Sequence, residues 1–179
     1  EDILRRAHLP DDTFSRTGRG LDTDEYIRLW LALESGMNNP AFPLNLVEKV
    51  SAEVFDPPLF AALCSTNMMQ AVQRLARYKQ LIAPMALETA VDHNGILTVS
   101  PCWLSATSIP ISLQVAELAF LLRLARLATR EPVNALKVQL PPLQSVVQAG
   151  HFTRFFGTTI SQGDKPSVSF SATDALRPF

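Results

Sequence analysis

The stretch Leu87-Glu-Thr-Ala-Val-Asp-His-Asn-Gly-Ile-Leu-Thr-Val99 decides the fold class, because the hydrophobic period changes here from that of helices to that of strands. On both sides of its central Asn94-Gly95 pair, every second residue is apolar or β-branched, and the side chains of a strand point alternately to its two faces. We therefore predict a β-hairpin over residues 85–101. The side chains expected to share one face of this small sheet are Leu87, Thr89, Val91, Leu97 and Val99.

The turn of this hairpin has two possible registers. A two-residue Asn94-Gly95 turn would place Val91 opposite Thr98 and would mix apolar and polar side chains on each face. A three-residue turn with Gly95 in the left-handed conformation pairs Val91 with Leu97 instead, and Thr89 with Val99. We predict the three-residue turn, because it keeps the apolar side chains together.

The chain before the hairpin has the apolar spacing of amphipathic helices. Asp22 and Glu25 resemble a capping box, which marks the start of a helix whose buried stripe begins at Tyr26 and includes Trp30. The other helices predicted in this part cover residues 2–8, residues 43–54, a segment that begins after the Asp56 cap, and a segment from a cap at Ser65 or Thr66 to about Ile82.

After the hairpin, the segment Ile111 to Arg130 is the most apolar helix of the chain. Residues 133–140 and 168–170 have the composition of strands, and residues 144–156 that of a helix. Because helices dominate and strands do not alternate with them, we predict an α+β fold and not a doubly wound one. The expected architecture is one helix-rich domain over residues 1–179, with a small, mostly antiparallel sheet made of the 85–101 hairpin and two later strands.

Composition excludes several classes of protein. The 179 residues are 47% hydrophobic and 18% charged, which is typical of a globular domain, and no apolar run is long enough for a membrane span. The net charge of -1 gives the domain no general attraction to a phosphate backbone, so we expect it to bind DNA poorly by itself. Two cysteines without metal-ligand spacing favour a reducing, cytoplasmic location.

Catalytic and metal-binding motifs are missing from the sequence. His8, His93 and His151 are dispersed, and neither a nucleophile elbow nor a phosphate-binding glycine loop occurs. We therefore expect no enzyme activity, no metal and no cofactor. The alternative is a small thiol-dependent enzyme that uses Cys64 or Cys102 with His151, which would require a reactive thiolate.

Two features suggest a ligand pocket. Lys79 interrupts the apolar stripe of its helix, so its ammonium either extends to the rim or points into a pocket, and Tyr78 is its neighbour. Trp103, after the hairpin, could close the mouth of such a pocket. We expect Lys79, Tyr78 and Trp103 near the rim of a cavity beside the predicted sheet. An effector carboxylate would be the natural partner of an otherwise unpaired Lys79.

The segment Ile111 to Arg130 is apolar on more than one side, so one layer of neighbours would not cover it. We expect a second subunit to cover part of it and so to form a homodimer, with the 144–156 helix as a possible addition. The residues expected at this contact are Val115, Leu118, Leu122 and Arg126.

Several sequence segments, taken in their order along the chain, resemble segments of one protein family. The opening Glu1-Asp-Ile-Leu-x-x-Ala-x-Leu-Pro10 is similar to the start of the arabinose-binding-type N-terminal domain of AraC/XylS transcription regulators. The other similar segments are Phe55-Asp-Pro-Pro-Leu-Phe-Ala-Ala-Leu-Cys-Ser65, Arg74-Leu-Ala-x-Tyr-Lys79-x-Leu-Ile-Ala-Pro84, Glu117-Leu-Ala-Phe120 with Leu124-Ala-Arg126, Phe155-Phe-Gly157, and Ser171-Ala-Thr-Asp-Ala-Leu-Arg-Pro-Phe179. No single segment is diagnostic, but the ordered set covers nearly the whole chain.

This resemblance implies a domain that senses a small effector, self-associates, or does both, to control a DNA-binding domain. In such regulators two helix-turn-helix motifs follow the domain, and they are absent from this chain, so DNA is expected to bind only through that missing part. The family transfers no ligand motif to particular residues, because its effectors are chemically varied. A dimerisation module without a ligand is the remaining alternative.

Overall fold

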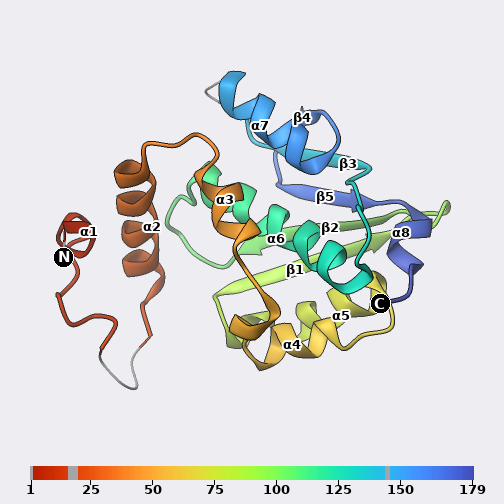
Figure 1. Ribbon diagram of the computed structural model, residues 1–179, viewed down its shortest axis with the longest axis horizontal. Helices are drawn as coiled ribbons and strands as arrows, with labels where there is room; N and C mark the ends of the chain where they lie inside the picture. The colour runs from red at the N-terminus through yellow and green to blue at the C-terminus, as the bar shows by residue number, and fades with distance from the viewer. Residues whose placement is uncertain (1, 16–19, 144–145) are drawn as a thin grey trace.

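The computed structural model describes residues 2–15, 20–143 and 146–179 (Figure 1). Its helices are α1 (Asp2–Arg6), α2 (Thr23–Met37), α3 (Phe42–Glu48), α4 (Pro57–Leu63), α5 (Met68–Tyr78), α6 (Ile111–Thr129), α7 (Val146–Phe156) and α8 (Ala172–Leu176), with the short 3-10 helices η1 (Ala52–Val54) and η2 (Lys79–Leu81). The strands are β1 (Met85–Val91), β2 (Leu97–Trp103), β3 (Lys137–Leu140), β4 (Ile160–Gln162) and β5 (Ser167–Phe170).

These elements confirm the predicted α+β class. The strands form one sheet in the order β1-β2-β5-β3-β4, in which only the β3–β4 pair is parallel. The hairpin has the predicted register, because Val91 pairs with Leu97 and Thr89 with Val99. Gly95 has φ +76°, the left-handed conformation that a three-residue turn requires.

Helices cover one face of the sheet. Helix α6 packs against β2, β3 and β5, and α3 lies on the opposite side of α6, so that α6 is enclosed between the sheet and α3 (Figure 1). Sheet residues such as Leu97, Val99 and Val168 are at most 1% exposed on this side. The other face carries polar side chains, among which the hydroxyls of Thr98 and Ser169 are hydrogen-bonded at 2.9 Å.

The N-terminal helices α1 and α2 lie beside this body (Figure 1). Helix α2 begins with the predicted capping box, because the Asp22 side chain accepts from the Glu25 amide at 2.8 Å and the Glu25 carboxylate accepts from the Asp22 amide at 3.0 Å. A small separate cluster that includes Leu4 and Leu29 joins α1 to α2. Trp30 of α2 reaches the main core and packs on Phe42 with ring centroids 5.2 Å apart.

Several boundaries differ from prediction. The helix expected over residues 43–54 is divided into α3 and η1, because the chain is extended at Ser51 between them. The cap of α5 is Asn67 and not Ser65 or Thr66, since the extended Asn67 accepts from the Gln70 amide at 3.0 Å. Strand β4 and helix α8 were not predicted, and the first two residues of the helix expected over 144–156 lie outside the described residues.

Candidate ligand-binding site

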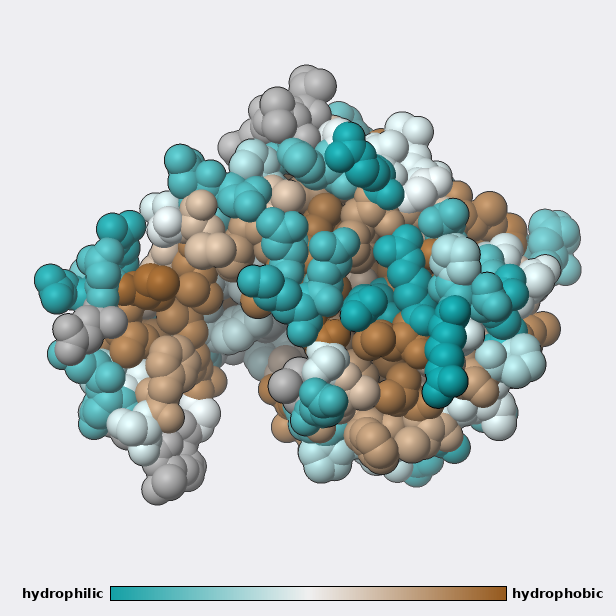
Figure 2. Space-filling view, in the orientation of Figure 1, coloured by the Kyte–Doolittle hydropathy of each residue, from teal (hydrophilic) through white to brown (hydrophobic). Residues whose placement is uncertain are grey.

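A cleft of about 610 Å³ lies where the N-terminal helices meet the body. It is walled by α2 and the residues before it, the start of α4, η2, the end of β2 and the middle of α6. In Figure 2 the surface is hollowed between α2 and α4, two of the elements that supply this wall. The lining residues are Gly20, Leu21, Asp22, Thr23, Tyr26, Asp56, Leu59, Lys79, Ile82, Ala83, Pro84, Trp103 and Glu117.

An ion pair between Lys79 and Glu117 forms the polar centre of the cleft. The Lys79 Nζ and Glu117 Oε2 atoms are 3.2 Å apart, and only 12% and 17% of the two side chains are exposed. Lys79 continues the inner stripe of α5 into η2, and Glu117 is the only acidic residue of α6. Of the two orientations considered for Lys79, the structure has the inward one.

Two aromatic side chains form another wall of the cleft. Tyr26 from α2 and Trp103 from β2 stack with ring centroids 6.3 Å apart and an interplanar angle of 22°. Desolvation of the phenol and the negative charge of Glu117 raise the pKa of Tyr26 to about 12, although 36% of the residue is exposed. The buried Trp103 Nε1 donor has no hydrogen-bond partner among the described residues, so its requirement for an acceptor is unmet.

A second, more apolar chamber adjoins the cleft. It measures about 170 Å³ and shares Tyr26, Leu59, Lys79 and Glu117 with the larger space. Its remaining wall is apolar and consists of Trp30, Leu46, Val47, Val50, Leu113, Ala116 and Phe120. The two spaces share the ion pair, and the smaller one extends the site with a mostly apolar compartment.

The structure brings together only part of the predicted site. Lys79 and Trp103 both line the cleft, whereas Tyr78 is 39% exposed and is not part of its wall. The five hairpin residues do not line it either. Leu87, Leu97 and Val99 are buried beneath the helices, whereas Thr89 and Val91 are exposed because the helices do not cover the far end of β1.

Other wall residues were not predicted. Tyr26 was assigned to the buried stripe of its helix and Asp56 to a helix cap, and Leu59 and Glu117 were given no role. Glu117 carried a usable signal, because a single carboxylate in the most apolar helix requires a partner. Because Glu117 pairs with Lys79, the ammonium is not unpaired, and the expectation that it binds an effector carboxylate loses its basis.

The residues predicted for self-association have other roles in this conformation. Val115, Leu118 and Leu122 are fully buried inside the chain, so they offer no surface to a second subunit. The Arg126 guanidinium donates to the carbonyl oxygens of Val133 at 2.8 Å and Phe155 at 2.7 Å. The second layer that covers α6 is therefore α3 of the same chain, and this placement argues against α6 as a dimer surface.

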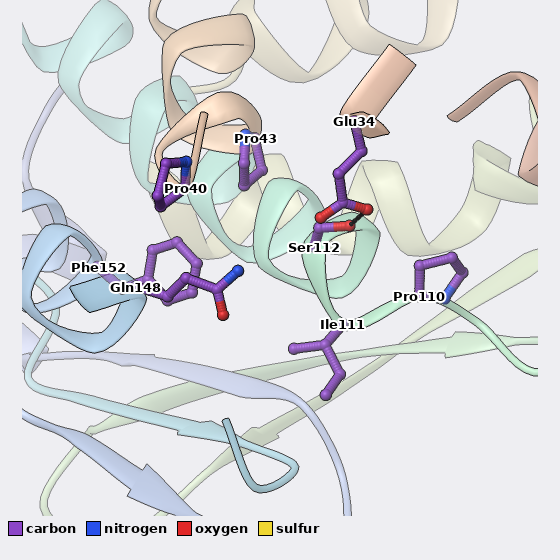
Figure 3. A pocket seen from close by; sticks show the side chains of 8 residues that line it. All are labelled: Glu34, Pro40, Pro43, Pro110, Ile111, Ser112, Gln148 and Phe152. Atoms are coloured by element: carbon purple, nitrogen blue, oxygen red, sulfur yellow. Dashed lines mark hydrogen bonds between the residues drawn. The ribbon is translucent and has the colours of Figure 1, made fainter. Parts of the chain in front are cut away.

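A smaller cavity of about 190 Å³ lies at the start of α6 (Figure 3). There the Trp30 Nε1 donates to Ser112 Oγ at 2.9 Å, and Ser112 Oγ donates to Glu34 Oε2 at 2.8 Å. A carboxylate at this position stabilises the positive end of the α6 dipole, which has no side-chain cap. The polar side chains beside this cavity therefore already have structural partners, and we do not assign a ligand to it.

The part of the chain that the structure describes gives little support to a metal site, a thiol-dependent active site or a membrane span. No group of three or more His, Cys, Asp or Glu side chains there could hold a metal ion. Both cysteines are free thiols, and α4, which is followed directly by Cys64, is far from α7, which carries His151 (Figure 1). None of the described helices has the length and apolar character needed to cross a membrane.

Comparison with known proteins identifies the family. The family described as "Arabinose-binding domain of AraC transcription regulator, N-term" matches residues 1–179. The chain belongs to this family. The AraC-type domain is also similar to the crystal structure of the transcriptional regulator CdpR from Pseudomonas aeruginosa, with a TM-score of 0.59 and 14% identity over 99% of this chain. The match covers 57% of that regulator, and no curated protein matches significantly.

The family membership confirms the resemblance seen in the sequence. The AraC-type domain is a ligand-sensing regulatory domain, and both its family and its structural neighbour are transcription regulators, not enzymes. At 14% identity the neighbour supports the fold alone.

Proposed function

We propose that this AraC-type domain binds a small organic effector in the cleft around the Lys79–Glu117 ion pair and thereby controls an attached DNA-binding domain. The observation that supports this site is the meeting of two nearly buried opposite charges with an aromatic stack in a cleft of about 610 Å³. A concave, largely apolar site with a few convergent polar groups is what small-molecule recognition requires.

The position of the cleft suits a sensor. Its walls come from α2, α4, η2, β2 and α6, which are distant in sequence. An effector in contact with several of them would favour the arrangement in which they lie closest together. A ligand shifts a conformational equilibrium only by the difference between its affinities for the two states. A ligand that contacts all these elements in the closed arrangement would lose some of those contacts in an open one, and it would therefore favour the closed arrangement.

Self-association and DNA binding complete the proposal. We propose a homodimer that sets the spacing of two attached DNA-binding domains, with effector binding biasing the dimer between two arrangements. Since Val115, Leu118 and Leu122 are buried within one chain, we place this contact on another surface. With its net charge of -1, the domain itself contributes little to DNA affinity, and a cytoplasmic location follows from the proposed role.

Thermal unfolding against a set of metabolites tests the cleft. A ligand that binds only the folded state raises the melting temperature. Leu59→Trp fills the cleft, and Leu136→Trp is the matched control, because Leu136 is 49% exposed and lies outside the cleft wall. We expect a stabilising metabolite to act on the wild type and Leu136→Trp but not on Leu59→Trp.

Two results would contradict the proposal. An equal shift in all three proteins would place the effector elsewhere, and no shift with any metabolite would favour a dimerisation module without a ligand. The thiol-enzyme alternative is tested separately, since it requires rapid alkylation of Cys64 or Cys102 at neutral pH.

A further inference from the structure

We infer that the cleft selects a cationic amphiphile, namely a primary amine with a short apolar chain, and rejects the matching carboxylate. This inference rests on the proposed function, because it assigns a chemical class to the ligand of the same site. It also reverses the expectation from sequence, where an unpaired Lys79 would have favoured an effector carboxylate.

The charges on the cleft wall support a cation. Asp22, Asp56 and Glu117 contribute three carboxylates, whereas Lys79 contributes the one ammonium, so the described wall has a formal charge of -2. Lys79 is already neutralised by Glu117 at 3.2 Å. An incoming carboxylate would have to displace Glu117 and would face the other two carboxylates, whereas an ammonium meets an excess of negative charge.

Asp56 supplies a free acceptor for this ammonium. It occupies the N-cap position of α4, with φ -67° and ψ 162°, yet its side chain makes no capping hydrogen bond. No ion pair joins it to any residue in the described ranges, which leaves both carboxylate oxygens available. Hydrogen bonds between ionised partners are the stronger kind, so this carboxylate is the group that would discriminate an amine from a neutral ligand.

The aromatic rings and the adjoining apolar chamber suit the same ligand, although an alkylammonium offers no acceptor to the Trp103 Nε1 donor. Tyr26 and Trp103 stack on each other in the cleft wall, and aromatic rings attract ammonium groups through their quadrupoles. The adjoining chamber, walled by side chains such as Leu46, Val50 and Phe120, would take the carbon chain. An amphiphile with its charged end toward Asp56 and its apolar end in the chamber would use both compartments.

Three six-carbon probes test the inference: n-hexylamine, 1-hexanol and hexanoate at pH 7, with binding measured by calorimetry and thermal unfolding. The amine is cationic at this pH, as the lysine side chain is. We expect hexylamine to bind roughly tenfold more tightly than hexanol, and hexanoate to bind most weakly. The preference for the amine should decrease as the salt concentration rises.

Two variants make the test specific. Asp56→Asn should weaken hexylamine binding roughly tenfold and leave hexanol binding nearly unchanged, because only a charged contact is lost. Glu88→Gln is the matched control, since the Glu88 carboxylate is exposed on β1 and pairs with Lys165 outside the cleft. It should bind all three probes as the wild type does.

Stronger binding of hexanoate, an amine preference that persists in Asp56→Asn, or no response to any probe would overturn the inference. These failures are distinguishable from failure of the proposed function. Hexanoate binding that Leu59→Trp abolishes would retain the cleft as the effector site and reject only the cation. If no probe binds, the metabolite screen still decides separately whether the cleft is the effector site.

Discussion

Removing either member of the Lys79–Glu117 ion pair leaves the other charge in a largely desolvated cleft. The Nζ and Oε2 atoms are 3.2 Å apart. At this distance Coulomb's law gives about 5 kcal/mol for an effective dielectric constant of about 20 and about 1.3 kcal/mol in bulk water. Since 12% and 17% of the side chains are exposed, we expect a coupling energy of about 2 kcal/mol, between these limits.

A double-mutant cycle measures this coupling. The variants are Lys79→Met, Glu117→Gln and the double variant, and the free energy of unfolding is taken from urea titrations. The matched control is the exposed Lys165–Glu88 pair at 3.4 Å, whose side chains are 70% and 57% exposed. The corresponding Lys165→Met and Glu88→Gln cycle should give about 0–0.5 kcal/mol, as surface pairs do.

Equal coupling energies in the two cycles would refute the reasoning. Such a result would mean that water screens the cleft pair as fully as the surface pair. Lys79 and Glu117 would then be open to solvent, and the excess negative charge of the cleft would be too weakly felt to select a cation.

Three further predictions concern the fold and the cleft. Leu118→Ala should cost about 2–5 kcal/mol in urea unfolding because the side chain is fully buried in one chain, and an unchanged stability would reopen the case for α6 as a dimer surface. Gly157→Ala should cost at least about 1 kcal/mol, since φ is +73° and a Cβ would clash with the Asn134 side chain. Gly36→Ala is the control, because it has open space and should be neutral or stabilising. Folding raises the pKa of Tyr26 from 10.0 to about 12, so its stabilising contribution is complete below pH 10 and is lost as the pH rises toward 12. In parallel urea titrations, Tyr26→Phe should therefore lose less stability over this interval than the wild type. Equal losses in the two proteins would contradict the pKa shift.

Local sequence patterns predicted those features that depend on neighbouring residues. The hairpin register followed from the alternation around Gly95, and the start of α2 followed from the spacing of Asp22 and Glu25. Strand β4 was missed because it has only three residues, and its parallel pairing with β3 depends on contacts distant in sequence.

The cleft was only partly predictable for the same reason. Lys79 was recognisable because a charge interrupts an apolar stripe, but the sequence did not show that Glu117, 38 residues away, is its partner. The apolar character of α6 was read as a sign of a second subunit. In the structure the same side chains are covered by the sheet and by α3, which a pattern within one helix does not reveal.

The most direct test of the cleft as effector site is a crystal structure of the AraC-type domain with the metabolite that most raises its melting temperature. We predict that this ligand lies between Tyr26, Trp103 and the Lys79–Glu117 ion pair, with its apolar part toward Phe120. A ligand bound instead in the cavity beside Glu34 and Ser112, with an empty cleft, would contradict the proposal.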